Sequence, residues 1–341
     1  MKKIGVLGAG TWGMALARML CLNGHSVTVW SAIEQEIDTF SATRQHPNLP
    51  GMEIPQAVAF TKDMAQVCAG MDILLFAVPS PFVRSTARKA APFVQSGQII
   101  VDVAKGIEAD TLFTMTQIIA EEIKNPAVKL VALSGPTHAE EVAKDLPTTI
   151  VSAGEDPAAA ELVQRVFSND CMRVYTNDDV LGVELCGAMK NIIALASGIA
   201  TGLGCGDNAK AAIITRGIAE IARLGAAMGC KEQTFGGLAG IGDLIVTATS
   251  MHSRNNRCGM LLGQGVAPDA AVRQVGMVVE GINALPAAIR MAQMHKVEMP
   301  IVEAVNAVVN GASTPAEAVR QLMTRDRKPE LPPSALDNRY D

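Results

Sequence analysis

Residues 3–17 of the chain read KIGVLGAGTWGMALA, and this stretch decides the fold. A short apolar run leads into the glycine pattern Gly8, Gly10 and Gly13, and a helical pattern follows it. The first glycine permits a tight turn, the second lets the backbone approach a pyrophosphate, and the third allows close helix–strand packing. The following helix directs free N–H groups and a positive dipole end at the phosphates. We therefore predict a dinucleotide site; FAD competes with NAD(P) for it, and a tight turn without a ligand is the alternative.

Outward from this stretch, strand-length apolar runs alternate with helical patterns. The runs rich in Val, Ile and Leu lie at 26–30, 73–78, 99–103 and 129–133, and helical patterns such as 12–23 and 81–93 separate most of them. Further strands are expected at 148–153 and 172–176, around a helix at 157–167. This alternation predicts an α/β fold with a parallel, doubly wound, Rossmann-like sheet covered by helices on both faces.

The pattern changes near residue 178. Long helical patterns at 180–200 and 208–228 follow, a glycine-rich interruption lies at 236–242, and strand-like runs almost vanish. We predict a dinucleotide-binding domain at 1–177, an all-α substrate domain at 178–325, and a mobile, charged and proline-containing tail at 326–341.

Composition limits the partners and the location. The net charge of −5 argues against a nucleic-acid surface. The seven scattered cysteines indicate reduced thiols. The sequence contains no CxxC or HExxH motif that would indicate a metal site. The N-terminus resembles a first strand more than a signal peptide. The sequence has no uninterrupted apolar run of about 18 residues, the length that would predict a membrane span. A cytoplasmic protein without a membrane span or a bound metal is expected.

The second strand should end on the residue that reads the cofactor ribose. An acid there favours NAD, and a nearby arginine favours NADP. The chain has Trp30-Ser31-Ala32-Ile33-Glu34, with neither residue type at the strand end and Glu34 already in the next helix. The choice between NAD and NADP is therefore open.

Several segments carry polar residues at positions that are unusual for a hydrophobic core. Lys105 follows a predicted strand, and ligands of open α/β sheets bind outside the carboxyl ends of strands. The segment 133–138 follows the next strand with small residues and a hydroxyl, Asp243 follows a glycine turn, and 253–257 reads Ser-Arg-Asn-Asn-Arg. Such a run can clamp a phosphate, because guanidinium groups match its geometry. Taken singly, Lys105 could equally be an ordinary loop lysine and 133–138 a plain turn, and the run 253–257 would be read as a solvated helix end; the four segments together favour a site.

Lys190 is the most informative residue. It lies beside Asn191 in a helix whose neighbours are small and apolar. A lysine that reaches solvent along its apolar stem is the common alternative. Burial beside a cleft would instead lower its pKa, so that it could exchange a proton near neutrality.

Together, these segments resemble the bacterial NAD(P)-dependent glycerol-3-phosphate dehydrogenases. The likeness covers nearly the whole chain, and its most specific stretches are 8–17, 101–108, 133–138, 184–194, 236–243, 253–259 and 278–281. The family interconverts sn-glycerol 3-phosphate and dihydroxyacetone phosphate by hydride transfer. The resemblance further implies a homodimer and a supply of glycerol 3-phosphate for phospholipid synthesis.

The resemblance also assigns roles to matching positions. Lys190 would be the general acid/base. The substrate would be bound by Lys105, Gly135, Thr137, Lys190, Asn191, Asp243, Ser253, Arg254 and Asn255. The cofactor would be bound by Gly8, Gly10, Thr11, Trp12, Gly13, Lys105, Ala139, Arg254, Val278 and Glu280. Many members carry an arginine just after the second strand, and this chain lacks it, which weakens the case for tight NADP binding.

Two other functions remain open. A dehydrogenase of a 3-hydroxy acid or of ketopantoate would use a cation, such as Arg254, for a carboxylate. A non-catalytic dinucleotide sensor would not require Lys190, Asn191, Asp243 and Arg254.

Overall fold

The computed structural model describes residues 1–330, and its first half is built on one eight-stranded sheet. The strand order is β3-β2-β1-β4-β5-β6-β7-β8. The strands are β1 (Lys3–Leu7), β2 (Ser26–Trp30), β3 (Ala59–Thr61), β4 (Ile73–Phe76), β5 (Ile99–Asp102), β6 (Lys129–Ser134), β7 (Thr148–Ala153) and β8 (Met172–Asn177). The order reverses between β1 and β4, the kind of point where open α/β sheets bind ligands.

The predicted doubly wound α/β sheet is confirmed, with two differences. The three-residue strand β3 was not predicted, and β7 pairs antiparallel with β6 whereas the other neighbours pair parallel. A parallel crossover needs a dozen or more residues, usually with a full helix. The β6–β7 connection contains only the one-turn helix α6 (Ala139–Val142), so β7 returns in the opposite direction.

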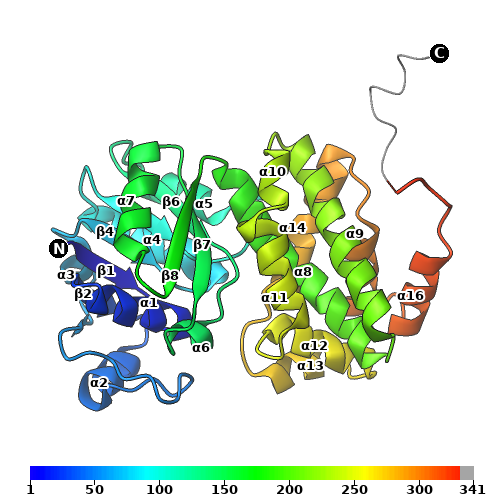
Figure 1. Ribbon diagram of the computed structural model, residues 1–341, viewed down its shortest axis with the longest axis horizontal. Coiled ribbons are helices and arrows are strands. Elements are labelled where there is room, and N and C mark those ends of the chain that lie inside the picture. Colours follow the sequence, from blue (N-terminus) through cyan, green and yellow to red (C-terminus); the bar gives the residue numbers. More distant parts are fainter. Residues whose placement is uncertain (331–341) are drawn as a thin grey trace.

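Helices cover both faces of the sheet (Figure 1). α1 (Thr11–Leu22) and α7 (Pro157–Phe167) pack on one face, against side chains such as Ile4 and Val6. α4 (Val83–Ala90) and α5 (Met115–Ile123) pack on the other, against Leu7 and its neighbours. This alternation follows from the two-residue period of a strand. The short helices α2 (Glu34–Thr43) and α3 (Met64–Cys68) complete this half.

The second half is helical and is arranged around α8 (Val180–Gly202). This helix contacts α9 (Gly206–Ala227), α11 (Asp243–Thr249), α12 (Arg254–Gly263) and α14 (Glu280–His295). The remaining helices are α10 (Glu232–Phe235), α13 (Pro268–Val275), α15 (Pro300–Val309) and α16 (Pro315–Met323). By length and composition alone α8 could cross a bilayer, but 89% of its apolar window is buried inside the protein. It therefore serves as the core helix of this half.

The two halves meet close to the predicted boundary. β8 ends at Asn177 and α8 begins at Val180, while the division near residue 178 into separate domains stays a prediction. Most of the predicted tail, residues 331–341, lies outside the described residues. Just before it, Lys328 Nζ lies 2.9 Å from a carboxylate oxygen of Glu298.

Candidate active site

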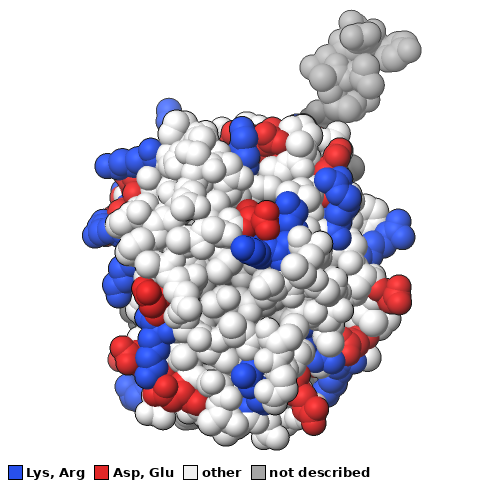
Figure 2. All heavy atoms as spheres, turned by 90° about the vertical axis from the view of Figure 1, so that its left-hand side faces the viewer, with Lys and Arg blue, Asp and Glu red and all other residues white. Residues whose placement is uncertain are grey.

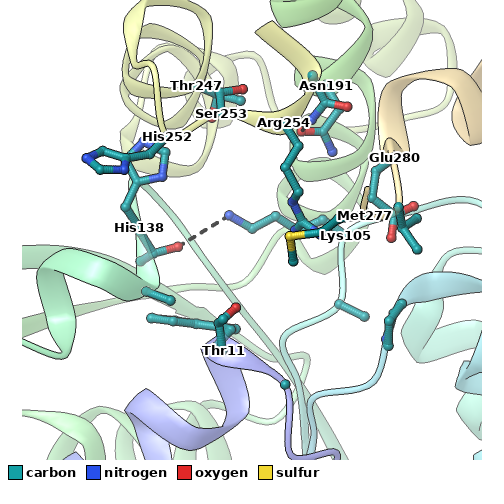
Figure 3. Close-up of a pocket in the computed structure, with 18 of the residues that line it drawn as sticks. Thr11, Lys105, His138, Asn191, Thr247, His252, Ser253, Arg254, Met277 and Glu280 are labelled. Carbon is teal, nitrogen blue, oxygen red and sulfur yellow. Dashed lines mark hydrogen bonds between the residues drawn. The ribbon is translucent and has the colours of Figure 1, made fainter. Parts of the chain in front are cut away.

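A cleft of about 490 Å³ lies between the carboxyl ends of the parallel strands and the helical half. Residues from both halves line it, and Figure 3 shows Thr11 opposite Ser253, with Lys105 between them. Most of the predicted site residues line this cleft: Gly10, Thr11, Trp12, Lys105, Thr137, Ala139, Lys190, Asn191, Asp243, Ser253, Arg254, Asn255, Val278 and Glu280. The structure therefore brings together residues that are up to 270 positions apart, from Gly10 to Glu280 (280 − 10 = 270).

Three predicted glycines act through the backbone outside the cleft lining. Gly8 has φ of 121°, and a Cβ there would lie 2.6 Å from the Ala77 carbonyl oxygen. A Cβ on Gly13 would lie 2.3 Å from the Gly8 carbonyl oxygen, so the start of α1 packs directly on the turn. Gly135 turns the chain after β6, and its carbonyl oxygen accepts a hydrogen bond from Lys105 Nζ at 3.1 Å.

The fingerprint turn fits a dinucleotide pyrophosphate. A Cβ on Gly10 would meet nothing within 4 Å, so the backbone faces open space there. α1 begins at Thr11 with no side-chain cap and no acidic residue in its first turn. Its first N–H groups are therefore available to an anion, and the helix dipole favours negative charge at that end.

At the other side of the cleft, two lysines share one carboxylate. Lys190 Nζ donates to Asp243 Oδ1 at 2.5 Å, and Lys105 Nζ donates to Oδ2 at 2.7 Å. The Lys190 and Asp243 side chains are only 7% and 1% exposed. Lys190 also donates to the Thr247 hydroxyl at 2.6 Å. The pKa of Lys190 is lowered to about 7, mainly because the side chain is buried; Asp243 opposes this effect and the nearby Lys105 adds to it.

Small residues make room for these side chains. Asp243 is the first residue of α11, and the preceding turn, Leu238–Gly242, departs from helical geometry at Gly240. A Cβ on Gly240 would lie 2.1 Å from the Phe235 carbonyl oxygen, so only glycine fits. In α8, a Cβ on Gly187 would lie 3.4 Å from Lys105 Cγ, which brings Lys105 close to the helix that carries Lys190.

The predicted phosphate clamp lies at the start of α12. Ser253 caps this helix by accepting the N–H of Asn256, which leaves its own hydroxyl hydrogen free to donate. The Arg254 side chain is directed toward Lys105 in Figure 3. Burial lowers the pKa of Arg254, and Glu280 opposes this effect. A guanidinium in a partly desolvated cleft is well suited to bind an anion.

Asn191 and Asn255 are held within the protein. Asn255 donates to the side-chain oxygen of Asn191 at 3.0 Å and accepts the N–H of Gly281 at 2.8 Å. Asn191 in turn donates to the Gly187 carbonyl oxygen at 3.2 Å. This series of hydrogen bonds links α8, α12 and α14, so both amides orient the helices that carry Lys190 and Arg254. Their predicted direct contact with substrate stays a prediction.

Glu280 closes the end of the cleft beside the sheet. Its carboxylate accepts a hydrogen bond from the Ser80 hydroxyl at 2.7 Å, which joins the two halves of the molecule. Burial raises the pKa of Glu280, and the bonds from Ser80 oppose that rise. Val278 and Ala139 lie in the same cleft lining.

Sequence reasoning assigned no role to several polar residues of the cleft, among them Thr247, His138 and His252. Thr247 follows Asp243 by four residues on α11, so helical spacing could have revealed it. His138 and His252 come from opposite halves, with ring centroids 5.8 Å apart (Figure 3). Burial lowers the pKa of His138, and so does the charge of Lys190. Nothing in the sequence pairs these two histidines, because His138 ends the segment 133–138 and His252 precedes the segment 253–257, more than 100 positions later.

Within residues 1–330, no group of three or more His, Cys, Asp or Glu side chains is placed to hold a metal ion. Lysines, arginines, amides and hydroxyls of the cleft suit anionic and carbonyl oxygens, while the carboxylates of Asp243 and Glu280 accept hydrogen bonds from Lys190, Lys105 and Ser80.

Comparisons with known proteins match both halves of the chain. The sequence model of the family NAD-dependent glycerol-3-phosphate dehydrogenase N-terminus matches residues 3–160. The sequence model of the family NAD-dependent glycerol-3-phosphate dehydrogenase C-terminus matches residues 179–320. A protein of Lactobacillus delbrueckii subsp. bulgaricus named glycerol-3-phosphate dehydrogenase (NAD(P)+) 2 is 64% identical over 97% of this chain and 99% of its own length. A second relative of that name without the numeral, from Agathobacter rectalis, is 52% identical over 97% of this chain and 98% of its own length.

Solved structures agree. The crystal structure of glycerol-3-phosphate dehydrogenase from Coxiella burnetii has a TM-score of 0.90 and 35% identity, covering 95% of this chain and 99% of that one. A ketopantoate reductase from Ralstonia eutropha has a TM-score of 0.62 at 18% identity, covering 93% of this chain and 99% of that one, which shows a shared fold alone. The resemblance read from the motifs is confirmed, and the chain belongs to the NAD-dependent glycerol-3-phosphate dehydrogenase family.

Proposed function

We propose that this chain interconverts sn-glycerol 3-phosphate and dihydroxyacetone phosphate with NAD(P) as the hydride carrier. The observation that carries the proposal is the Lys190–Asp243–Lys105 cluster, which lies in one cleft with a dinucleotide turn and with Arg254. The relatives of this chain in Lactobacillus delbrueckii and Agathobacter rectalis are named for this enzyme.

The proposed roles follow from the chemistry of the side chains. Bound NAD(P)H supplies the hydride that reaches the C2 carbonyl carbon of dihydroxyacetone phosphate. The Lys190 ammonium donates its proton to the C2 oxygen, because a group with a pKa near 7 can both give and take a proton at neutral pH. Lys105 stabilises the negative charge that develops on that oxygen.

The remaining residues bind and orient the substrate. Arg254 and the Ser253 hydroxyl bind its phosphate, while Asp243 accepts hydrogen bonds from both lysines and fixes their positions. Asn191 and Asn255 hold the helices in register beneath this arrangement. In the oxidative direction the same groups act in reverse, with neutral Lys190 accepting the C2 hydroxyl proton.

A steady-state assay of dihydroxyacetone phosphate reduction with NADH and with NADPH tests the proposal. Ketopantoate and a 3-oxo acid serve as competing substrates in the same assay. Turnover of the phosphate substrate alone supports the proposal. Turnover of either competitor without the phosphate substrate overturns it, and cofactor binding without any turnover would indicate a sensor.

Three further parts of the proposal rest on family membership. We propose a homodimer, a cytoplasmic location, and use of the product glycerol 3-phosphate in phospholipid synthesis. Light scattering of the purified protein tests the dimer, and cell fractionation tests the location. Loss of phospholipid synthesis in a strain without this gene, restored by added glycerol 3-phosphate, tests the metabolic use.

A further inference from the structure

The residues after β2 form a polar group that the sequence alone did not show. The Ser31 hydroxyl donates to Glu36 Oε2 at 2.6 Å and accepts the N–H of Ile33 at 3.1 Å. Ser31 is buried, so this bond anchors a carboxylate from the first turn of α2 against the end of the strand. The following helix therefore supplies a carboxylate that the end of the strand itself lacks.

This group lies next to the fingerprint turn. The N–H of Gly8 donates to the Trp30 carbonyl oxygen at 2.8 Å, and Ser31 is the next residue along the chain. The imidazole of His46 gives a second link: burial lowers its pKa, while the Ala9 carbonyl and the Glu36 carboxylate both oppose that effect. The His46 imidazole therefore lies near both Ala9 of the fingerprint turn and the Glu36 carboxylate. The adenosine ribose of a dinucleotide occupies this position in the fold.

Two cations lie along this edge of the sheet, and carboxylates or carbonyls already engage both. Lys62 Nζ lies 2.8 Å from an Asp38 oxygen and 3.5 Å from a Glu34 oxygen. Arg44 donates to the Val58 carbonyl oxygen at 2.7 Å, and its guanidinium lies over the Phe60 ring. A 2′-phosphate would have to compete with these partners, whereas a ribose hydroxyl needs only an acceptor.

We infer that the Ser31–Glu36 pair makes this chain select NAD(H) over NADP(H), with Glu36 accepting a hydrogen bond from the adenosine ribose. The inference deepens the proposed function and rests on it for the presence of a dinucleotide. A 2′-phosphate placed against Glu36 meets like charge, and within about 5 Å such repulsion weakens binding by roughly tenfold or more.

Calorimetric titration of the full-length protein with NADH and NADPH, without substrate, tests the inference. We expect NADPH to bind at least about tenfold more weakly than NADH. Glu36→Gln should lower the ratio of the NADPH dissociation constant to the NADH dissociation constant. It should do so mainly by tightening NADPH binding, because glutamine removes the repelling charge and keeps an acceptor oxygen. Ser31→Ala should lower this ratio less, because Glu36 loses its anchor but keeps its charge.

Glu161→Gln is the matched control. It makes the same change in formal charge on an exposed side chain of α7 and should leave the ratio unchanged. Wild-type protein that binds NADPH as tightly as NADH overturns the inference. So does a Glu36→Gln ratio equal to that of the wild type.

The two proposals fail separately. Tight, selective NADH binding without reduction of dihydroxyacetone phosphate would refute the proposed function and keep the cofactor assignment. Turnover with NADPH as efficient as with NADH, together with equal affinities, would keep the function and refute the assignment. Binding of neither cofactor would overturn both.

Discussion

Lys190 Nζ lies 2.5 Å from Asp243 Oδ1, and both side chains are withdrawn almost completely from solvent. Burying two charges is costly, and it is sustained where hydrogen bonds and a second cation complete the arrangement. Here Thr247 and Lys105 do so. The low solvent exposure keeps the pKa of Lys190 near 7 despite the carboxylate, which places a proton donor in the cleft at neutral pH.

Replacing Lys190 with alanine should lower turnover of dihydroxyacetone phosphate by about 10²–10⁴-fold, the usual contribution of a positioned general acid. The affinity for NADH should stay within about twofold, because Lys190 lies across the cleft from the fingerprint. Steady-state kinetics and a cofactor titration measure the two quantities. Lys210→Ala, at a partly exposed lysine of α9, is the control. Wild-type turnover in the Lys190 variant would contradict its role.

Turnover should depend on pH through Lys190. Reduction needs the protonated amine, so its rate should fall as the pH rises through about 7; oxidation needs the neutral amine and should rise over the same interval. Asp243 raises the pKa of Lys190, so Asp243→Asn should move both transitions to lower pH. Profiles of kcat/KM against pH in both directions show this shift. If the pH midpoint of kcat/KM were the same in Asp243→Asn as in the wild type, the titrating group would not be Lys190.

The strongest periodic patterns predicted the fold well. β1, α1 and β2 were placed within a residue or two, because a strand buried on both faces and a glycine turn leave few alternatives. The three-residue β3 carries too short a pattern to detect. The antiparallel β7 depends on the compact β6–β7 connection, whose path no local pattern encodes.

The site was predictable where local chemistry is unusual and missed where it depends on packing. Lys190 was identified because a lysine in an apolar helix has few explanations. The Lys105–Asp243 contact joins residues 138 positions apart, and only the tertiary fold brings them together. Glu36 was overlooked for a related reason: it reaches the end of β2 from inside α2 through the Ser31 hydroxyl.

Arg254→Lys should raise the KM for dihydroxyacetone phosphate by about tenfold or more, because an ammonium cannot reproduce the paired contacts of a guanidinium with a phosphate. Turnover at saturation should change less, since Lys190 is untouched. Dihydroxyacetone, which lacks the phosphate, is the internal control, and its slow reduction should be nearly unaffected. An equal loss on both substrates would show that Arg254 acts on something other than the phosphate.

Gly259→Ala should destabilise the protein by about 1–3 kcal/mol or more, as overpacking of a tight contact does. A Cβ on Gly259 would lie 2.1 Å from the Leu195 carbonyl oxygen, so α12 would have to move away from α8. Urea denaturation measures the free energy of unfolding. Gly236→Ala is the control, because the nearest neighbour of its Cβ would lie 3.8 Å away. Equal stability of both variants would mean that the α8–α12 contact adjusts freely.

Glu220→Gln should remove part of the dependence of stability on pH. Burial raises the pKa of Glu220 from 4.5 to about 7, although the Ile301 and Val302 N–H groups oppose this by donating to its carboxylate. Because the folded state holds the proton more tightly than the unfolded state, stability from this group is present below about pH 4.5 and is lost as the pH rises through 7. The loss is at most about 3 kcal/mol. Glutamine cannot ionise, so the variant should lose less stability than the wild type between pH 5 and pH 8 in urea denaturation. Glu161→Gln, at an exposed position, should follow the wild-type curve, and a Glu220 variant that also follows it would assign the pH dependence to other groups.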